Sequence, residues 1–73
     1  MNNDIFLLIG KNMKKFRQEK GYSLKDLSRM TNISIKELEK IEQEGTTEKT
    51  NLETLNTIAT SLNIKIVDLF QKD

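Results

Sequence analysis

The chain contains no cysteine and no histidine. Without cysteine it has no disulfide framework, no thiolate metal site and no cysteine nucleophile; without histidine, the usual general base and zinc ligand are missing. The three glycines are isolated and form no glycine-rich phosphate loop. We therefore expect a protein that is not an enzyme and that has no cofactor and no metal site.

Long apolar segments are missing as well. The longest apolar run covers residues 5–9, which is far short of the roughly 20 residues that cross a bilayer. The Asn-Asn-Asp that precedes this run lacks the positive charge of a signal peptide. The sequence therefore predicts a soluble cytoplasmic protein that does not contact a membrane.

A length of 73 residues predicts one domain, spanning residues 1–73. Such a chain buries only about 60% of the surface that it exposes when unfolded, so its stability should be modest and a second subunit would help.

The net charge of +1 is low for a nucleic-acid binder, but the charges are distributed unevenly along the chain. Residues 1–29 carry seven basic and three acidic side chains, whereas residues 30–73 carry five and eight.

Residues 23–44, SLKDLSRMTNISIKELEKIEQE, show the pattern of two short amphipathic helices joined by a tight turn. Each helix begins with the spacing of a capping box, since Ser23 stands three residues before Asp26 and Ser34 three residues before Glu37. Asn32 lies where the first helix must stop, and asparagine adopts the left-handed conformation of such a stop more readily than most residues. The segment is therefore predicted to be a helix-turn-helix.

This segment resembles the helix-turn-helix of DNA-binding domains of the Cro and phage-repressor type, the XRE family. IGKNMKKFRQEKGYS resembles the first helix of that family and NLETLNTIATSLNIKIVDLF its fourth and fifth helices, so the resemblance covers about residues 9–70. It implies an all-α, lambda-repressor-like fold: a compact five-helix bundle with a central helix-turn-helix. The chain departs from the family at Leu24, where a phosphate-contacting glutamine is common. Its loop 45–50 is also longer than usual and lacks the proline and most of the basic residues found there.

The first helix is predicted to be capped by Asn3 or Asp4, to run to about Lys20 and to stop at Gly21. Its buried face is formed by apolar residues at helical spacing: Ile5, Ile9, Met13 and Phe16. Leu7 points away from that face. It is either a singly exposed leucine or part of a dimer contact.

After the polar loop, Asn51 is predicted to cap a helix over residues 52–62, and Asn63 to end it. The buried face of this helix is formed by apolar residues at helical spacing: Leu52, Leu55, Ile58, Ala59 and Leu62. A short last helix over residues 65–70 would bury three apolar side chains, Ile66, Leu69 and Phe70. Val67 would point outward and is a second candidate for a dimer contact.

By resemblance, the second helix of the motif is the recognition helix. On a helical wheel Lys36, Lys40 and Gln43 share the side opposite its apolar face. Lysine can donate to guanine or phosphate and glutamine can pair with adenine, so this stripe suits the major groove; the alternative is a solvated charged face. Glu37 and Glu39 flank the stripe and would repel phosphates, although Glu37 can be used in the capping box and Glu39 could accept from a cytosine amine.

The starts of the two helices of the motif add further candidate contacts. Ile35 matches a family position that often reads a base; it could meet a thymine methyl group or instead pack against the neighbouring loop. Ser34 lies beside it. Ser23, Lys25 and the amides at the start of the first helix of the motif would hold phosphate.

Glu42 lies on the inner side of the recognition helix, next to apolar Ile41, and a carboxylate there is costly unless a cation meets it. Arg17 matches the family position whose arginine pairs with this glutamate, so the resemblance implies an ion pair between the two helices. We interpret this pair as structural, because an acid–base role would need a second titrating group in a cleft.

These features lead to the hypothesis of a sequence-specific transcriptional regulator of the repressor type. It would bind a double-stranded DNA operator as a homodimer, with residues 35–44 in the major groove. The alternative is a helix-turn-helix fold used as a protein-interaction module, such as an antirepressor or an inhibitor, with weak or no DNA binding. The acidic flanks of the recognition helix, Leu24 and the loop poor in basic residues favour that alternative.

Overall fold

The computed structural model describes residues 4–72, and for Asp4 the backbone alone. This part of the chain forms four α-helices and one short 3-10 helix: α1 (Asp4–Glu19), α2 (Leu24–Thr31), α3 (Ile35–Glu44), α4 (Leu52–Ser61) and η1 (Ile66–Phe70). The sequence predicted a bundle of five helices. In residues 4–72 the structure has four α-helices, and the fifth element is a short 3-10 helix. No helix within residues 4–72 combines the length and the apolarity needed to cross a membrane.

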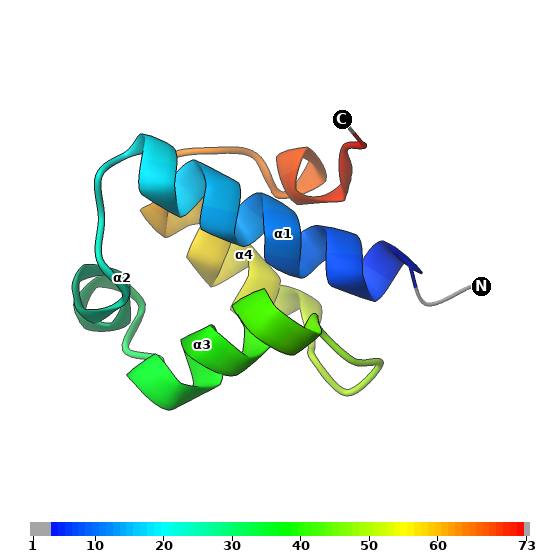
Figure 1. The fold of residues 1–73 in the computed structure, drawn as a ribbon, viewed down its shortest axis with the longest axis horizontal. Helices are drawn as coiled ribbons and strands as arrows, with labels where there is room; N and C mark the ends of the chain where they lie inside the picture. The colour runs from blue at the N-terminus through cyan, green and yellow to red at the C-terminus, as the bar shows by residue number, and fades with distance from the viewer. Residues whose placement is uncertain (1–3, 73) are drawn as a thin grey trace.

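The longest helix, α1, organises the bundle (Figure 1). It crosses the molecule in front of α4, with α3 below it and η1 above it, while α2 lies at the end opposite the N-terminus. The helix α1 packs against α3 and η1, and α4 packs against α2 and η1. The helix-turn-helix formed by α2 and α3 is thus supported from one side by α1 and from behind by α4.

The helix ends follow the capping signals of the sequence, with one difference. At Ser23 the capping box is complete, whereas at Ser34 the hydroxyl accepts from the Glu37 amide at 3.0 Å and no return bond from the Glu37 side chain is formed. The expected use of Glu37 in a capping box is therefore wrong, and its carboxylate remains exposed at the surface. Helix α4 is capped by Asn51, as predicted.

The predicted helix stops have the backbone conformation that such stops require. Gly21, Asn32 and Asn63 have φ values of 76°, 64° and 59°, all in the left-handed region. Helix α4 ends at Ser61, one residue earlier than predicted. The predicted cap of α1 at Asn3 or Asp4 lies outside the described side chains.

The core is a single cluster of buried side chains to which all five elements contribute. Its members are Ile9, Met13, Leu27, Leu38, Ile41, Leu55, Ile58, Ala59, Leu62 and Leu69. Phe16, Ile66 and Phe70 pack against it as partly buried residues. Two residues that were predicted to be buried are exposed: 39% of Ile5 and 67% of Leu52 are accessible to solvent. Both lie at the start of a helix, where helical spacing marks the inward direction but no neighbouring element reaches far enough to cover the side chain.

A buried asparagine in α1 was missed by the sequence reasoning. The Asn12 side chain is 4% exposed, and its Nδ2 donates to the carbonyl oxygens of Leu69 at 2.7 Å and Gln71 at 2.8 Å. Because η1 is short, its end leaves carbonyl groups without helical partners, and Asn12 satisfies two of them. This side chain therefore fastens the C-terminal segment to α1.

The close approach of α1 to the end of α3 depends on two glycines. A Cβ atom added at Gly10 would overlap the carbonyl oxygen of Ile41 and lie 3.2 Å from the Cα of Gly45. Gly45 itself has φ +86°, and a Cβ there would come within 2.7 Å of the Phe6 carbonyl oxygen. The two backbones meet without side chains between them, which allows the Thr46 amide to donate to the Phe6 carbonyl at 3.2 Å.

We expect Gly10→Ala to destabilise the protein although alanine is the better helix former. The added methyl group must push the backbone of α3 away from α1, and overpacking of this kind costs about 1 to 3 kcal/mol. Thermal and urea unfolding measure the loss. Gln18→Ala, at an exposed position of the same helix, is the matched control and should leave the free energy of unfolding nearly unchanged; equal effects of the two substitutions would contradict the proposed contact.

Candidate functional site

The turn between α2 and α3 is fixed by side chains at the end of α2. Thr31 is buried; its hydroxyl donates to the Leu27 carbonyl at 2.8 Å and accepts from the Ile33 amide at 3.1 Å. The Ser28 hydroxyl donates to the Ile33 carbonyl at 2.6 Å. The backbone groups that the reversal would leave unpaired are thus satisfied, and the angle between the two helices is held from within the turn.

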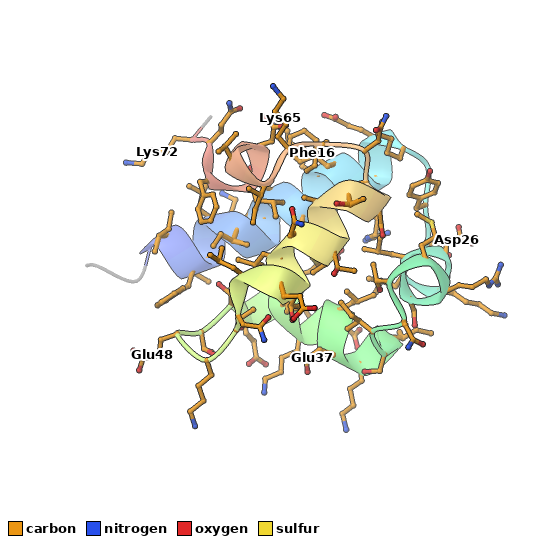
Figure 2. The ribbon with its side chains drawn as sticks, turned by 180° about the vertical axis from the view of Figure 1, so that it is seen from behind. Phe16, Asp26, Glu37, Glu48, Lys65 and Lys72 are labelled. Atoms are coloured by element: carbon orange, nitrogen blue, oxygen red, sulfur yellow. The ribbon has the colours of Figure 1, made fainter. Side chains whose placement is uncertain are left out.

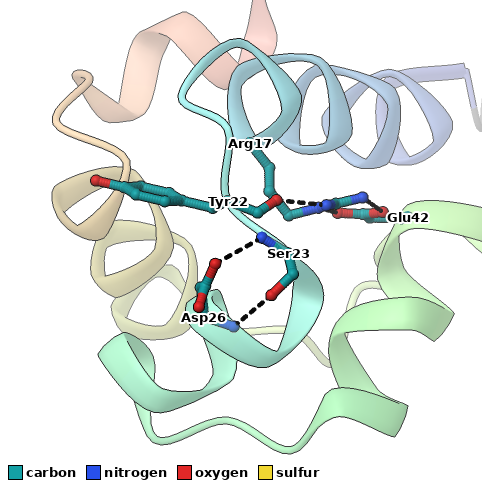
Figure 3. A network of polar contacts seen from close by, with 5 residues as sticks. All are labelled: Arg17, Tyr22, Ser23, Asp26 and Glu42. Atoms are coloured by element: carbon teal, nitrogen blue, oxygen red, sulfur yellow. Dashed lines mark hydrogen bonds and ion pairs between the residues drawn. The ribbon is translucent and has the colours of Figure 1, made fainter.

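An arginine from α1 holds the other end of α3 (Figure 3). Arg17 Nε donates to Glu42 Oε2 at 2.6 Å and its Nη2 donates to Glu42 Oε1 at 3.0 Å. The remaining nitrogen, Nη1, donates to the Tyr22 carbonyl at 2.8 Å. Since the Arg17 and Glu42 side chains are only 11% and 5% exposed, this two-point ion pair is largely removed from water.

The contact to Tyr22 links three parts of the structure. Tyr22 lies in the connection between α1 and α2, one residue before the cap of α2. One guanidinium group therefore sets the position of α3 relative to α1 and also the path of the chain into α2. The helix-turn-helix is oriented as a unit by this residue.

The start of α2 carries a complete capping box, also visible in Figure 3. The Ser23 amide donates to Asp26 Oδ2 at 2.9 Å, and the Asp26 amide donates to Ser23 Oγ at 3.0 Å. The bond from the Ser23 amide lowers the pKa of Asp26, with smaller contributions from the Ser23 hydroxyl and the positive charges of Arg29 and Lys25. The carboxylate is thus stabilised in its charged form at the positive end of the helix.

The outward side of α3 carries a stripe of exposed polar side chains, Lys36, Lys40 and Gln43. On its inner side Leu38 and Ile41 are fully buried in the core, so the rotation of α3 about its axis is fixed. The structure therefore brings together the three residues that the sequence assigned to base reading. We call these three residues the reading stripe.

Acidic side chains lie on both sides of the reading stripe. Glu37, Glu39 and Glu44 are exposed, and Figure 2 shows Glu37 at the lower edge of the molecule, on the side of α3 that faces away from α1. The electrostatic character of α3 is therefore mixed. Its surface offers hydrogen-bond donors and acceptors at fixed places rather than a continuous positive field.

The remaining candidate residues lie at the starts of the two helices. Ser23 and Ser34 are exposed caps, and Lys25 is exposed on the first turn of α2. Ile35, the first residue of α3, is 44% exposed, so a large part of this apolar residue is open to solvent. Most of the candidate contacts thus lie on α3, and a smaller group lies on the first turn of α2.

The sequence analysis did not identify several residues that hold the helices of this surface in place. The hydrogen bonds of the Thr31 and Ser28 hydroxyls were not predicted, since a hydroxyl near a helix end is compatible with many roles. Asn12 stood inside the apolar stripe of α1, and a polar residue at such a position could have been noticed as a candidate for a buried hydrogen bond. Gly10, inside a helix, was likewise a signal of close backbone approach.

The fold and this surface define a helix-turn-helix protein. The family model for the Cro/C1-type helix-turn-helix DNA-binding domain matches residues 12–71, and the chain belongs to this family of DNA-binding regulators. The resemblance noted in the sequence is thereby confirmed. Among curated proteins no sequence match was found.

Solved structures show the same fold. The hypothetical transcription factor NHTF from Neisseria is similar with a TM-score of 0.84 at 22% identity, over 94% of this chain and 77% of that one. The restriction-modification controller protein C.AhdI from Aeromonas hydrophila has a TM-score of 0.80 at 22% identity, over 89% of this chain and 96% of that one. The N-terminal DNA-binding domain of SinR from Bacillus subtilis has a TM-score of 0.78 at 26% identity, over 90% of this chain and 94% of that one. SinR has also been solved in complex with DNA.

We expect removal of either partner of the ion pair to destabilise the fold strongly. Arg17→Met or Glu42→Gln leaves the other partner without its salt bridge in a nearly buried place, and such changes cost about 3 to 5 kcal/mol. Thermal melts measure the loss. Lys14→Met, at an exposed position of α1, should change stability little, and losses of only a few tenths of a kcal/mol for the first two variants would show that the pair is not a structural support.

The capping box predicts a specific dependence of stability on pH. Because the folded pKa of Asp26 lies below its ordinary value of 3.8, its contribution to stability is fully present above 3.8 and is lost as the pH falls through the lower, folded value. Asp26→Asn removes this titration. Its unfolding temperature should fall less than that of the wild type between near-neutral pH and pH values below 3.8; parallel curves would contradict the assignment.

Proposed function

We propose that this protein is a sequence-specific transcriptional regulator that inserts α3 into the major groove of operator DNA. The observation that carries the proposal is the reading stripe: three polar side chains, all exposed, on one side of a helix whose opposite side is locked in the core. A helix held in this way presents its outward side chains in fixed register, which hydrogen bonding to base edges requires.

Each residue of the reading stripe has a chemistry that suits base edges. Lys36 and Lys40 can donate to the N7 and O6 acceptors of guanine, and Gln43 can pair with adenine through its amide. Ile35, with its exposed aliphatic side chain, is suited to contact a thymine methyl group. Glu37 stands beside these residues with a free carboxylate, which disfavours binding wherever α3 comes close to phosphate.

Phosphate contacts are assigned to the starts of α2 and α3. At α2 the Ser23 amide donates to Asp26 and the Asp26 amide donates to Ser23, which leaves the Ser23 hydroxyl proton, the amides of Leu24 and Lys25 and the Lys25 ammonium group to meet a phosphate. At α3 the cap residue Ser34 lies next to Ile35 and can contribute in the same way. These contacts would set the register of α3 on the duplex without reading sequence.

The similarity to SinR supports this assignment, since SinR is described as a master regulator for biofilm formation and has been solved in complex with DNA. We further propose that the protein acts in the cytoplasm as a homodimer on paired half-sites, because a single small helix-turn-helix makes few contacts.

A second candidate function is binding of another protein through the outward face of α3, as an antirepressor or inhibitor would. The observation that favours it is the set of exposed carboxylates on that helix, Glu37, Glu39 and Glu44, none of which forms an ion pair within residues 4–72. Leu24, partly buried against the core, also leaves the start of α2 without a side-chain donor at that position.

We expect two distinct effects on DNA binding from single lysine substitutions. Lys36→Ala or Lys40→Ala should cost about 1 to 3 kcal/mol on the preferred site wherever the lysine contacts a base, and should relax specificity at that base pair. Lys25→Ala should weaken binding to all sequences alike and reduce the salt slope by about one. Selection from random duplex DNA followed by titrations at several salt concentrations measures both effects.

Lys65→Ala serves as the control, because Lys65 is exposed next to η1. It should leave affinity and specificity unchanged. If no duplex sequence is preferred over bulk DNA at low salt, the regulator proposal fails, and the outward face of α3 becomes the surface to test for protein binding.

A further inference from the structure

An open pocket lies between the start of α1 and the loop 45–50. Its volume is about 510 Å³, which is within the range of pockets that hold small organic molecules. Figure 1 shows the start of α1 and this loop at the same end of the molecule, opposite α2. The pocket, which we call the end pocket, is lined by two residues of α1, the last residue of α3 and three residues of the loop: Phe6, Leu7, Glu44, Thr46, Thr47 and Glu48.

The helix α1 supplies the apolar part of the end pocket. Phe6 is partly buried and Leu7 is 48% exposed. Covering such apolar surface with a ligand is favourable, because it removes the surface from water. Val67, which the sequence predicted to point outward, is 56% exposed as well, but it lies on η1 and does not line this pocket.

The end of α3 and the loop make the end pocket negative. Glu44 and Glu48 are exposed, and neither carboxylate forms an ion pair within residues 4–72, although Lys49 is the next residue of the loop. Figure 2 shows Glu48 at the edge of the molecule, on the loop. The C-terminal end of a helix is the negative end of its dipole, and α3 has no basic residue in its last turn. Among residues 4–72, no basic side chain lines the pocket.

A buried hydroxyl that lacks a partner belongs to the same pocket. Thr46 helps to line it, is only 5% exposed, and its hydroxyl has no hydrogen-bond partner among the described residues. An unpaired buried polar group is costly, so a ligand group that pairs with it gains affinity. The hydroxyl can turn toward such a group, because a threonine side chain has more than one staggered position about its Cα–Cβ bond.

We propose that the end pocket binds an organic cation, in which an ammonium or guanidinium group is carried on a short apolar or aromatic body. The cationic group lies between the carboxylates of Glu44 and Glu48, where it donates charge-assisted hydrogen bonds. It also donates to the Thr46 hydroxyl. The apolar body covers Phe6 and Leu7. An anion of the same shape is repelled by the two carboxylates.

An occupied end pocket would join the start of α1 to the loop beside the last turn of α3. That turn carries Gln43 of the reading stripe. The proposal does not depend on the proposed DNA function, since the site can be tested with the protein and a ligand alone.

The experiment titrates the full chain with phenethylammonium chloride and follows the backbone amide signals by NMR. Saturable shifts should centre on the residues that line the end pocket, with a dissociation constant in the millimolar range, as expected for a ligand of this size. Binding should weaken at high salt. Hydrocinnamate, which has a similar body and the opposite charge, should cause no saturable shifts. Ethylammonium, which has the charge without the aromatic body, should bind at least tenfold more weakly.

The double variant Glu44→Gln, Glu48→Gln should bind phenethylammonium at least tenfold more weakly than the wild type. The matched control is Glu19→Gln, Glu39→Gln, which removes the same charge at two exposed positions that do not line the pocket; its affinity should stay within twofold. Thr46→Val keeps the shape of the side chain and should weaken binding at least threefold. Its unfolding temperature should stay equal or rise, because the lost hydroxyl has no partner in the free protein.

Four results would overturn the proposal. They are saturable shifts centred outside the end pocket, no saturable shifts with phenethylammonium, equal binding of hydrocinnamate or ethylammonium, and equal losses in the double variant and its control. Unchanged binding by Thr46→Val would overturn the role given to the hydroxyl.

Discussion

The nearly buried ion pair of Arg17 and Glu42 is the constraint on which the orientation of the helix-turn-helix depends. A guanidinium group out of contact with water needs partners for its donors, and here three of its nitrogens find them on α3 and on the connection into α2. Apolar packing fixes which side of α3 faces the core, but it tolerates sliding of one helix along another. The planar geometry of this pair, together with the backbone contact permitted by Gly10, allows one arrangement of α1 against α3.

This arrangement separates the two sides of α3 by role. The side of α3 that faces the rest of the protein holds the helix in place through Leu38, Ile41 and Glu42. The structure therefore does not depend on the exposed side chains of Lys36, Lys40 and Gln43. Substitutions in the reading stripe should therefore have little effect on stability, and under the proposed function they change recognition. The same separation makes the Glu42 carboxylate structural and leaves the carboxylates of Glu37 and Glu39 exposed at the surface.

The distribution of charge on the proposed interface favours base contacts over phosphate contacts. DNA-binding surfaces gain much of their affinity from neutralised phosphates, and that part does not depend on sequence. Here the acids beside the reading stripe and the loop with Lys49 as its single cation keep this contribution small. Under the proposed function, discrimination between sequences then depends on base contacts more than on neutralised phosphates.

The sequence by itself determined the positions of the helices and most of their ends, because capping hydroxyls, left-handed asparagines and apolar periodicity act within a few residues. It also indicated the outward stripe of α3, and by resemblance the partner of Glu42. Only the tertiary structure decided where burial ends: Ile5 and Leu52 fit the apolar period but lie beyond the elements that could cover them. The roles of Asn12, Gly10 and Thr46 were also decided there, since each depends on a backbone group brought close from a distant part of the chain.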